Sequence, residues 1–139
     1  MEQKLFTLTA AGIIHNPGMG RILLGKKENS FSALSTGWEF PSGIVSGQSL
    51  EDSLHDEIKK NTNLSVEVHH PVFSRTISEP EHTIAVYYYC ETYQTNAQAS
   101  GSLSEILWVK PKEYRNYIRI PAHPALAHLM SILEKKRLY

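Results

Sequence analysis

The stretch from Trp38 to Leu64 constrains the fold of this 139-residue chain more than any other. It starts with a short extended segment, bends at a glycine-containing loop, and then carries the start signal of a helix. Ser49 is a typical N-cap residue, and Asp52 stands three residues later as its reciprocal partner in a capping box. Polar residues end the pattern near position 61. The spacing therefore predicts a helix over residues 50–61, directly behind a tight loop.

The predicted helix has an apolar stripe with a polar flank beside it. Apolar residues recur at four-residue spacing and form the stripe: Leu50, Leu54 and Ile58. At about 100° per residue, four polar residues fall together next to this stripe: Ser53, Asp56, Glu57 and Lys60. The stripe predicts a contact with the core, and the flank predicts the lining of a groove.

The segments on either side show mainly β-type patterns. Residue types and turn signals predict strands over residues 4–14, 21–27, 64–75, 84–93 and 106–109, with a second helix from about Ala122. Residues 28–36 are rich in Ser and Asn without periodicity, which is typical of a surface loop. The order of elements predicts an α/β (α+β) domain in which a mixed β-sheet is sandwiched between helices.

Composition limits the class of protein. The length and the 41% of hydrophobic residues predict a single domain over residues 1–139. The 14 basic and 14 acidic residues balance, which argues against general binding to a nucleic-acid polymer or a membrane. Cys90 is the one cysteine, so an internal disulfide is excluded, and no apolar run approaches the length of a membrane span. These features predict a soluble, cytoplasmic protein.

The central stretch resembles the signature of the Nudix hydrolase family, in particular its small MutT-like members. That signature reads G-x5-E-x7-R-E-U-x-E-E-x-G-U, where U is a bulky aliphatic residue, and a W-x-x-P-G-G segment often precedes it. Here the preceding segment is WEFPSG, residues 38–43. If the loop is one residue short, Gln48 lies at the first glutamate and residues 56–64 overlie the last nine positions. RILLGKK resembles the family's second strand, and Glu105 its acidic residue before a Trp-Val strand.

The resemblance implies an activity that the residues of this chain support only in part. In the family, three glutamates hold Mg²⁺ or Mn²⁺ against the pyrophosphate of a nucleoside di- or triphosphate, and water attacks phosphorus. Glu57 is retained, whereas Lys60 and Asn61 stand at the positions of the other two glutamates. A cation at such a position opposes metal binding by about 1–4 kcal/mol for each charge pair. The chain therefore resembles a Nudix protein with a degenerate Nudix box.

The resemblance and the residue types together give a set of candidate site residues. The candidate catalytic residues are Glu57 and Glu105, and the candidate metal contacts are Glu57 and the backbone of Gly43. The candidate ligand-binding residues are Gly43, Glu39, Phe40, Lys60 and Asn61. Two alternatives stay open, namely that Glu105 is an exposed strand-end charge and that Phe40 completes the core. His69 and His70 are adjacent in a predicted strand and are expected to point to opposite sides of it.

Three functions remain open at this point. The first is a hydrolase of nucleoside di- or triphosphates, or of molecules linked to a nucleoside diphosphate, that works weakly with Mg²⁺ or Mn²⁺. The second is a catalytically inactive nucleotide-binding module that needs no metal, in which Lys60 meets phosphate directly. The third is an interaction or assembly domain, for example a homodimer, without a small-molecule ligand.

Overall fold

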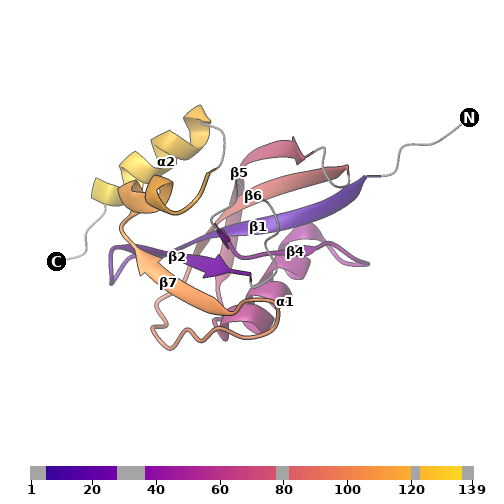
Figure 1. Ribbon diagram of the computed structural model, residues 1–139, viewed down its shortest axis with the longest axis horizontal. Coiled ribbons are helices and arrows are strands. Elements are labelled where there is room, and N and C mark those ends of the chain that lie inside the picture. Colours follow the sequence, from indigo (N-terminus) through magenta and orange to yellow (C-terminus); the bar gives the residue numbers. More distant parts are fainter. Residues whose placement is uncertain (1–5, 28–36, 78–81, 120–122, 136–139) are drawn as a thin grey trace, which may run out of the picture.

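The computed structural model describes residues 6–27, 37–77, 82–119 and 123–135, and Figure 1 shows their arrangement. Their elements are β1 (Thr7–Asn16), β2 (Arg21–Lys26), β3 (Trp38–Glu39), β4 (Ser42–Ile44), α1 (Leu50–Thr62), β5 (Glu67–Ile77), β6 (Thr83–Glu91), β7 (Glu105–Val109), the 3-10 helix η1 (Pro111–Asn116) and α2 (Pro124–Lys135). The predicted order of strands, helix, strands and helix is confirmed. The loop expected at residues 28–36 and the first two residues of the first predicted strand lie outside the described residues.

The strands form one mixed sheet in the order β3-β2-β1-β6-β5, with β4 pairing with β1 and β7 pairing with β2. β1 and β6 run parallel, with Thr7 opposite Thr83 and His15 opposite Glu91. The other strand pairs are antiparallel. The mixed sheet confirms the predicted fold class.

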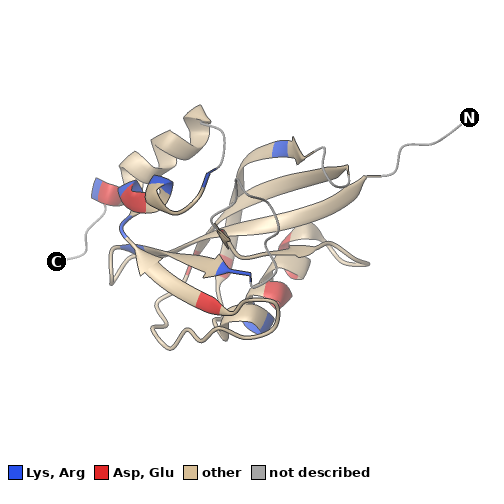
Figure 2. Cartoon of the chain, in the orientation of Figure 1, with Lys and Arg blue, Asp and Glu red and all other residues tan. Residues whose placement is uncertain are grey.

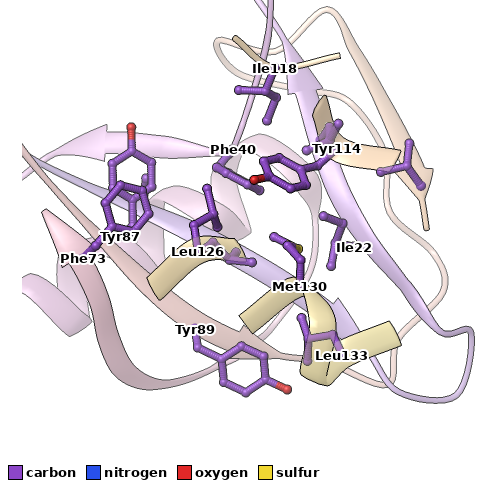
Figure 3. Close-up of a cluster of buried hydrophobic side chains, with 14 of the residues drawn as sticks. Ile22, Phe40, Phe73, Tyr87, Tyr89, Tyr114, Ile118, Leu126, Met130 and Leu133 are labelled. Carbon is purple, nitrogen blue, oxygen red and sulfur yellow. The ribbon is translucent and has the colours of Figure 1, made fainter. Parts of the chain in front are cut away.

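The two helices lie on opposite sides of this sheet (Figure 1). On one side, Leu54 and Ile58 of α1 pack into a cluster of buried residues with β1, β2 and β6, which we call the α1 cluster. On the other side, Leu126, Met130 and Leu133 of α2 pack into a second cluster, which we call the α2 cluster and which is drawn in Figure 3. Leu54 and Ile58 of the predicted stripe are buried and Leu50 is partly buried, whereas Asp56 and Lys60 of the polar flank are exposed. No helix within the described residues combines the length and the apolar character needed to cross a membrane.

Helix α1 begins and ends as its sequence indicates. Ser49 is the N-cap, and its hydroxyl oxygen accepts a hydrogen bond from the backbone N–H of Asp52 at 3.1 Å. The helix runs one residue beyond the predicted end, to Thr62. Asn63 then adopts the left-handed conformation with φ 65°, which asparagine tolerates better than most residues. The helix is therefore fixed at both ends by local signals.

The expectation for His69 and His70 is wrong, because β5 contains a bulge between Val68 and His70. Both histidine rings lie near the ring of Tyr89 on the neighbouring strand, with centroids 5.5 Å and 5.6 Å away. In a regular strand adjacent side chains alternate between faces, whereas a bulge sets two residues opposite one partner. The two histidines therefore share one side of the sheet.

Candidate functional site

The carboxylate side chain of Glu57 lies directly against the backbone of Gly43, across the contact between α1 and β4. A Cβ atom placed on Gly43 would come within 2.2 Å of Glu57 Cγ and 2.7 Å of Glu57 Cδ. Gly43 is held there by its pairing with Ala10 of β1. The structure thus brings together the two residues that the resemblance implies as metal contacts, and the absence of a side chain at position 43 makes the approach possible.

Asn61 occupies the position of a family glutamate but makes structural contacts. Asn61 is buried, with 1% of its surface exposed. Its Nδ2 donates to Glu57 Oε2 at 3.4 Å, and its Oδ1 accepts from the backbone N–H of Ser102 at 3.0 Å. The side-chain amide therefore connects the candidate carboxylate to the segment between β6 and β7.

That segment also satisfies the carbonyl groups in the last turn of α1. The backbone N–H of Gln98 donates to Thr62 O, the backbone N–H of Ser100 donates to Asn61 O, and the Ser100 hydroxyl donates to Lys60 O. The last carbonyls of a helix lack partners within the helix, so these contacts come from a distant part of the chain. Sequence reasoning missed this contact, because the short polar run at residues 100–102 carries no signal that pairs it with residues 60–62.

Lys60 is exposed on the same flank of α1 as Glu57. Residues three apart on a helix are neighbours, so Lys60 and Glu57 lie next to each other on the surface of α1. Figure 2 shows acidic residues along α1 giving way to lysines at its C-terminal end. This flank of α1 therefore combines one carboxylate with one exposed cation. Gln48, at the position of the family's first glutamate, is exposed in the loop before α1.

Glu105 lies on the other side of the sheet from Glu57. It is opposite Lys26 in the β2–β7 pair, and its Oε2 atom lies 3.6 Å from Lys26 Nζ. Lys26 is also opposite Trp38, which packs against the α2 cluster. Directly opposite residues in an antiparallel pair share a face, so Glu105 points toward the α2 side. Its side chain is 60% exposed, as the strand-end alternative expects.

Glu39 shares the α1 side of the sheet with Glu57 but is engaged elsewhere. It is opposite Gly25, which lies opposite Ile106 of the α1 cluster. Its Oε1 atom lies 3.0 Å from Lys27 Nζ, and its side chain is 40% exposed. Glu39 therefore lies on the same side of the sheet as Glu57, but its carboxylate is held in an exposed ion pair with Lys27.

Phe40 is part of the core. It is 2% exposed, and its ring lies edge-on to the ring of Tyr87, with centroids 6.1 Å apart. Figure 3 shows its ring among the residues that α2 covers. The expectation that this ring contacts a ligand is wrong, because the ring packs against Tyr87 and the other core residues.

Ser53 was placed on the polar flank by its sequence spacing but was not expected to take part in the site. It is 7% exposed, and its hydroxyl oxygen has no hydrogen-bond partner in the part of the chain that the structure describes. It lies one helical turn before Glu57, on the same face of α1. A buried hydroxyl without a partner is unfavourable, so we expect this hydroxyl to form a hydrogen bond with a group that binds at the site.

Cys90 takes no part in the chemistry of this site. It is fully buried in the α1 cluster, and burial raises the pKa of its thiol to about 12. The thiolate is the form that acts as a nucleophile or a metal ligand. The cysteine therefore serves as a small apolar core residue.

The divalent ion that the fold implies would find few donors at Glu57. Among the described residues, the one group of three close metal-ligating side chains does not include Glu57, Glu39 or Glu105. The donors at hand are the Glu57 carboxylate, the Gly43 backbone and the Ser53 hydroxyl. Mg²⁺ is usually held by one or two carboxylates together with substrate phosphates and water. This set fits an ion shared with a bound phosphate, and it does not fit a cage built by the protein alone.

Comparison with solved structures identifies the fold. The chain is similar to the MutT protein from Methanosarcina mazei Go1, with 20% identity over 98% of this chain and 96% of that chain and a TM-score of 0.71. It is similar to the E. coli ORF135 protein, with 23% identity over 93% and 91% of the two chains and a TM-score of 0.72. The NUDIX domain of Shewanella oneidensis NrtR, complexed with ADP ribose, has 17% identity over 93% and 86% of the two chains and a TM-score of 0.67.

These likenesses show that the chain has the Nudix fold. No protein-family model matches the sequence, and no curated protein matches it. The arrangement of strands and helices, which these solved structures share, confirms the resemblance to the Nudix family that the sequence indicates.

Proposed function

We propose that this chain is a Nudix hydrolase that acts slowly on small molecules containing a nucleoside di- or triphosphate. The observation that carries this proposal is the contact between Glu57 and the Gly43 backbone, which keeps the candidate carboxylate against the loop. The ADP ribose bound to the NrtR domain supports a ligand with a nucleoside diphosphate. The missing second and third carboxylates account for the low rate expected.

The residues of the site would each contribute one property. Mg²⁺ or Mn²⁺ bound with the substrate would neutralise phosphate charge and make phosphorus more open to attack by water. Glu57 would supply the protein carboxylate that orients this assembly. Asn61 would keep one Glu57 oxygen in place through its 3.4 Å hydrogen bond. Ser53, whose hydroxyl has no hydrogen-bond partner among the described residues, would donate a hydrogen bond to a phosphate or to an ordered water molecule.

Glu57→Gln is expected to lower kcat/KM for nucleotide hydrolysis at least tenfold. Glutamine keeps the size of the side chain and removes its negative charge. The decrease in kcat/KM therefore measures the contribution of the charge and not that of packing. The measurement is release of phosphate or nucleoside monophosphate from a broad nucleotide panel at millimolar Mg²⁺ and Mn²⁺. Asp56→Asn is the matched control, because Asp56 is an exposed carboxylate on the same helix. If the wild-type chain hydrolyses none of these compounds, the hydrolase proposal is wrong.

A second candidate function is metal-independent binding of a nucleotide. It is favoured by the exposed Lys60 beside Glu57 and by the engagement of Asn61 with the β6–β7 segment. In this case the Lys60 ammonium meets phosphate directly, and the domain binds its ligand without turnover.

Lys60→Ala is expected to weaken nucleotide binding about tenfold under the second candidate function, since one charge-assisted contact contributes roughly 1–2 kcal/mol. The measurement is calorimetry with ADP ribose and nucleoside diphosphates in the presence of a chelator. Lys59→Ala is the control, because Lys59 is an exposed neighbour whose Nζ donates to Asn63 O at 3.3 Å. Binding that requires Mg²⁺ would contradict this candidate and agree with the hydrolase.

A further inference from the structure

Three metal-ligating side chains meet where β5 begins and β6 ends. We call Glu67, His69 and Glu91 the β5–β6 cluster. Their ligand atoms all lie within 4.8 Å of one another. His69 Nε2 lies 2.9 Å from Glu91 Oε1 and 3.5 Å from Glu67 Oε2. Glu91 follows Tyr89 by two residues, so it shares with Tyr89 the side of the sheet that α2 covers.

The strand register makes this cluster electrostatically unfavourable without a cation. Glu67 lies directly opposite Glu91 in the β5–β6 pair. Like charges at directly opposite positions destabilise a sheet. Within the described part of the chain, the ion pairs of these two carboxylates involve only His69. With a neutral imidazole the cluster therefore carries two negative charges that a bound cation would offset.

Residues outside the cluster hold two of its members in position. The Tyr89 hydroxyl donates to Glu91 Oε2 at 2.6 Å and lies 3.2 Å from Nδ1 of the fully buried His15. The His69 ring stacks on the Tyr89 ring, with an interplanar angle of 26°. Metal ligands in proteins are usually oriented by such neighbouring groups.

We infer that Glu67, His69 and Glu91 bind one divalent transition-metal ion such as Zn²⁺. Zinc binds imidazole nitrogen and carboxylate oxygen at roughly 2.0–2.2 Å, so tetrahedral donors lie roughly 3.4 Å apart. The 3.5 Å between His69 Nε2 and Glu67 Oε2 agrees with this spacing. The 2.9 Å between His69 Nε2 and Glu91 Oε1 is a hydrogen-bond length, and a bound ion would replace that contact. One imidazole and two carboxylates suit Zn²⁺ or Co²⁺ better than Mg²⁺, which prefers oxygen donors alone. The Glu67 side chain is 81% exposed, so the ion would enter from solvent.

The test is a titration of the tag-free full chain with two metal ions. Calorimetry measures the binding of Zn²⁺, and visible absorption measures the binding of Co²⁺. One ion per chain is expected, and His69→Gln and Glu67→Gln should each weaken its binding at least tenfold. Glu67 is exposed, so its replacement leaves the fold intact. Tyr89→Phe keeps the ring and removes the hydroxyl that holds Glu91, and should weaken binding about tenfold.

Two control variants separate this site from other surfaces. His55 pairs with Asp56 at 3.5 Å on α1, so His55→Gln removes a comparable histidine–carboxylate pair elsewhere. Glu57→Gln removes the candidate carboxylate of the α1 site. Neither variant should change the affinity for Zn²⁺. The inference is overturned if no saturable Zn²⁺ binding occurs below millimolar concentration, if binding survives His69→Gln, or if it is lost in either control.

Discussion

Replacement of Asn61 by leucine is expected to lower the free energy of unfolding by about 2–3 kcal/mol, because a buried hydrogen-bonded amide is lost while its partners remain. The backbone N–H of Ser102 would lose its 3.0 Å acceptor, and Glu57 Oε2 would lose its donor. Leucine is similar in size, so the change measures mainly the hydrogen bonds. Urea unfolding followed by circular dichroism gives the free energy. Asn96→Leu is the control, because Asn96 is exposed in the same β6–β7 segment.

Asn61→Asp separates the two sides of this contact. Aspartate still offers an oxygen to the Ser102 N–H, but it places a second carboxylate where the Asn61 amide now lies 3.4 Å from Glu57 Oε2. Repulsion should lower the melting temperature without metal, and millimolar Mg²⁺ or Mn²⁺ should raise it again more than in the wild type. A variant that unfolds at the wild-type temperature and ignores metal would mean that position 61 does not face the metal side of Glu57.

Gly43→Ala is expected to lower the free energy of unfolding by about 2–3 kcal/mol through overpacking. The new methyl group would lie 2.2 Å from Glu57 Cγ and 2.8 Å from Glu57 Cβ, so the α1–β4 contact must open. The same displacement moves the candidate carboxylate away from the loop, and any hydrolysis or metal-dependent binding should fall with stability. Thermal unfolding and the nucleotide assay measure the two effects on one preparation.

Two further variants test the cause of that effect. Gly47→Ala adds a methyl group where, among the described residues, no atom beyond the two chain neighbours lies within 4 Å. The φ of 68° means that it should cost only about 1 kcal/mol through backbone strain. In Gly43→Ala combined with Glu57→Ala, the clashing Cγ and Cδ atoms are absent and only the 2.8 Å contact with Cβ remains. The double variant should therefore be more stable than the sum of the two single changes predicts, by about 1 kcal/mol or more. Strict additivity would contradict the close contact.

Local signals in the sequence predict much of this fold. The cap at Ser49, the four-residue spacing of Leu54 and Ile58, and the β-type runs each act within a few residues, so they can be read without knowledge of the rest of the chain. The same spacing correctly placed Glu57 beside an apolar stripe. The Gly43 contact follows from the position of the loop directly before α1.

Other features depend on residues that lie far apart in the chain. The motif predicts a substituted metal position at Asn61, whereas its hydrogen-bond partner Ser102 lies 41 residues away. The expectation for His69 and His70 failed because the bulge in β5 is set by pairing with β6. The motif groups Glu105 with Glu57, whereas the strand register places Glu105 on the other face of the sheet. Sequence spacing within one element does not determine any of these relations.

The parallel pairing of β1 with β6 affects the order in which the domain can assemble. β1 lies at the centre of the sheet, and its partner residues in β6 begin at Thr83. During synthesis the N-terminal strand must therefore wait until residues 83–91 have left the ribosome before one of its edges is covered. Contacts between such distant segments slow folding and leave strand edges exposed in the meantime. The β1–β2 hairpin and helix α1 can form earlier, but the sheet that joins them is completed late.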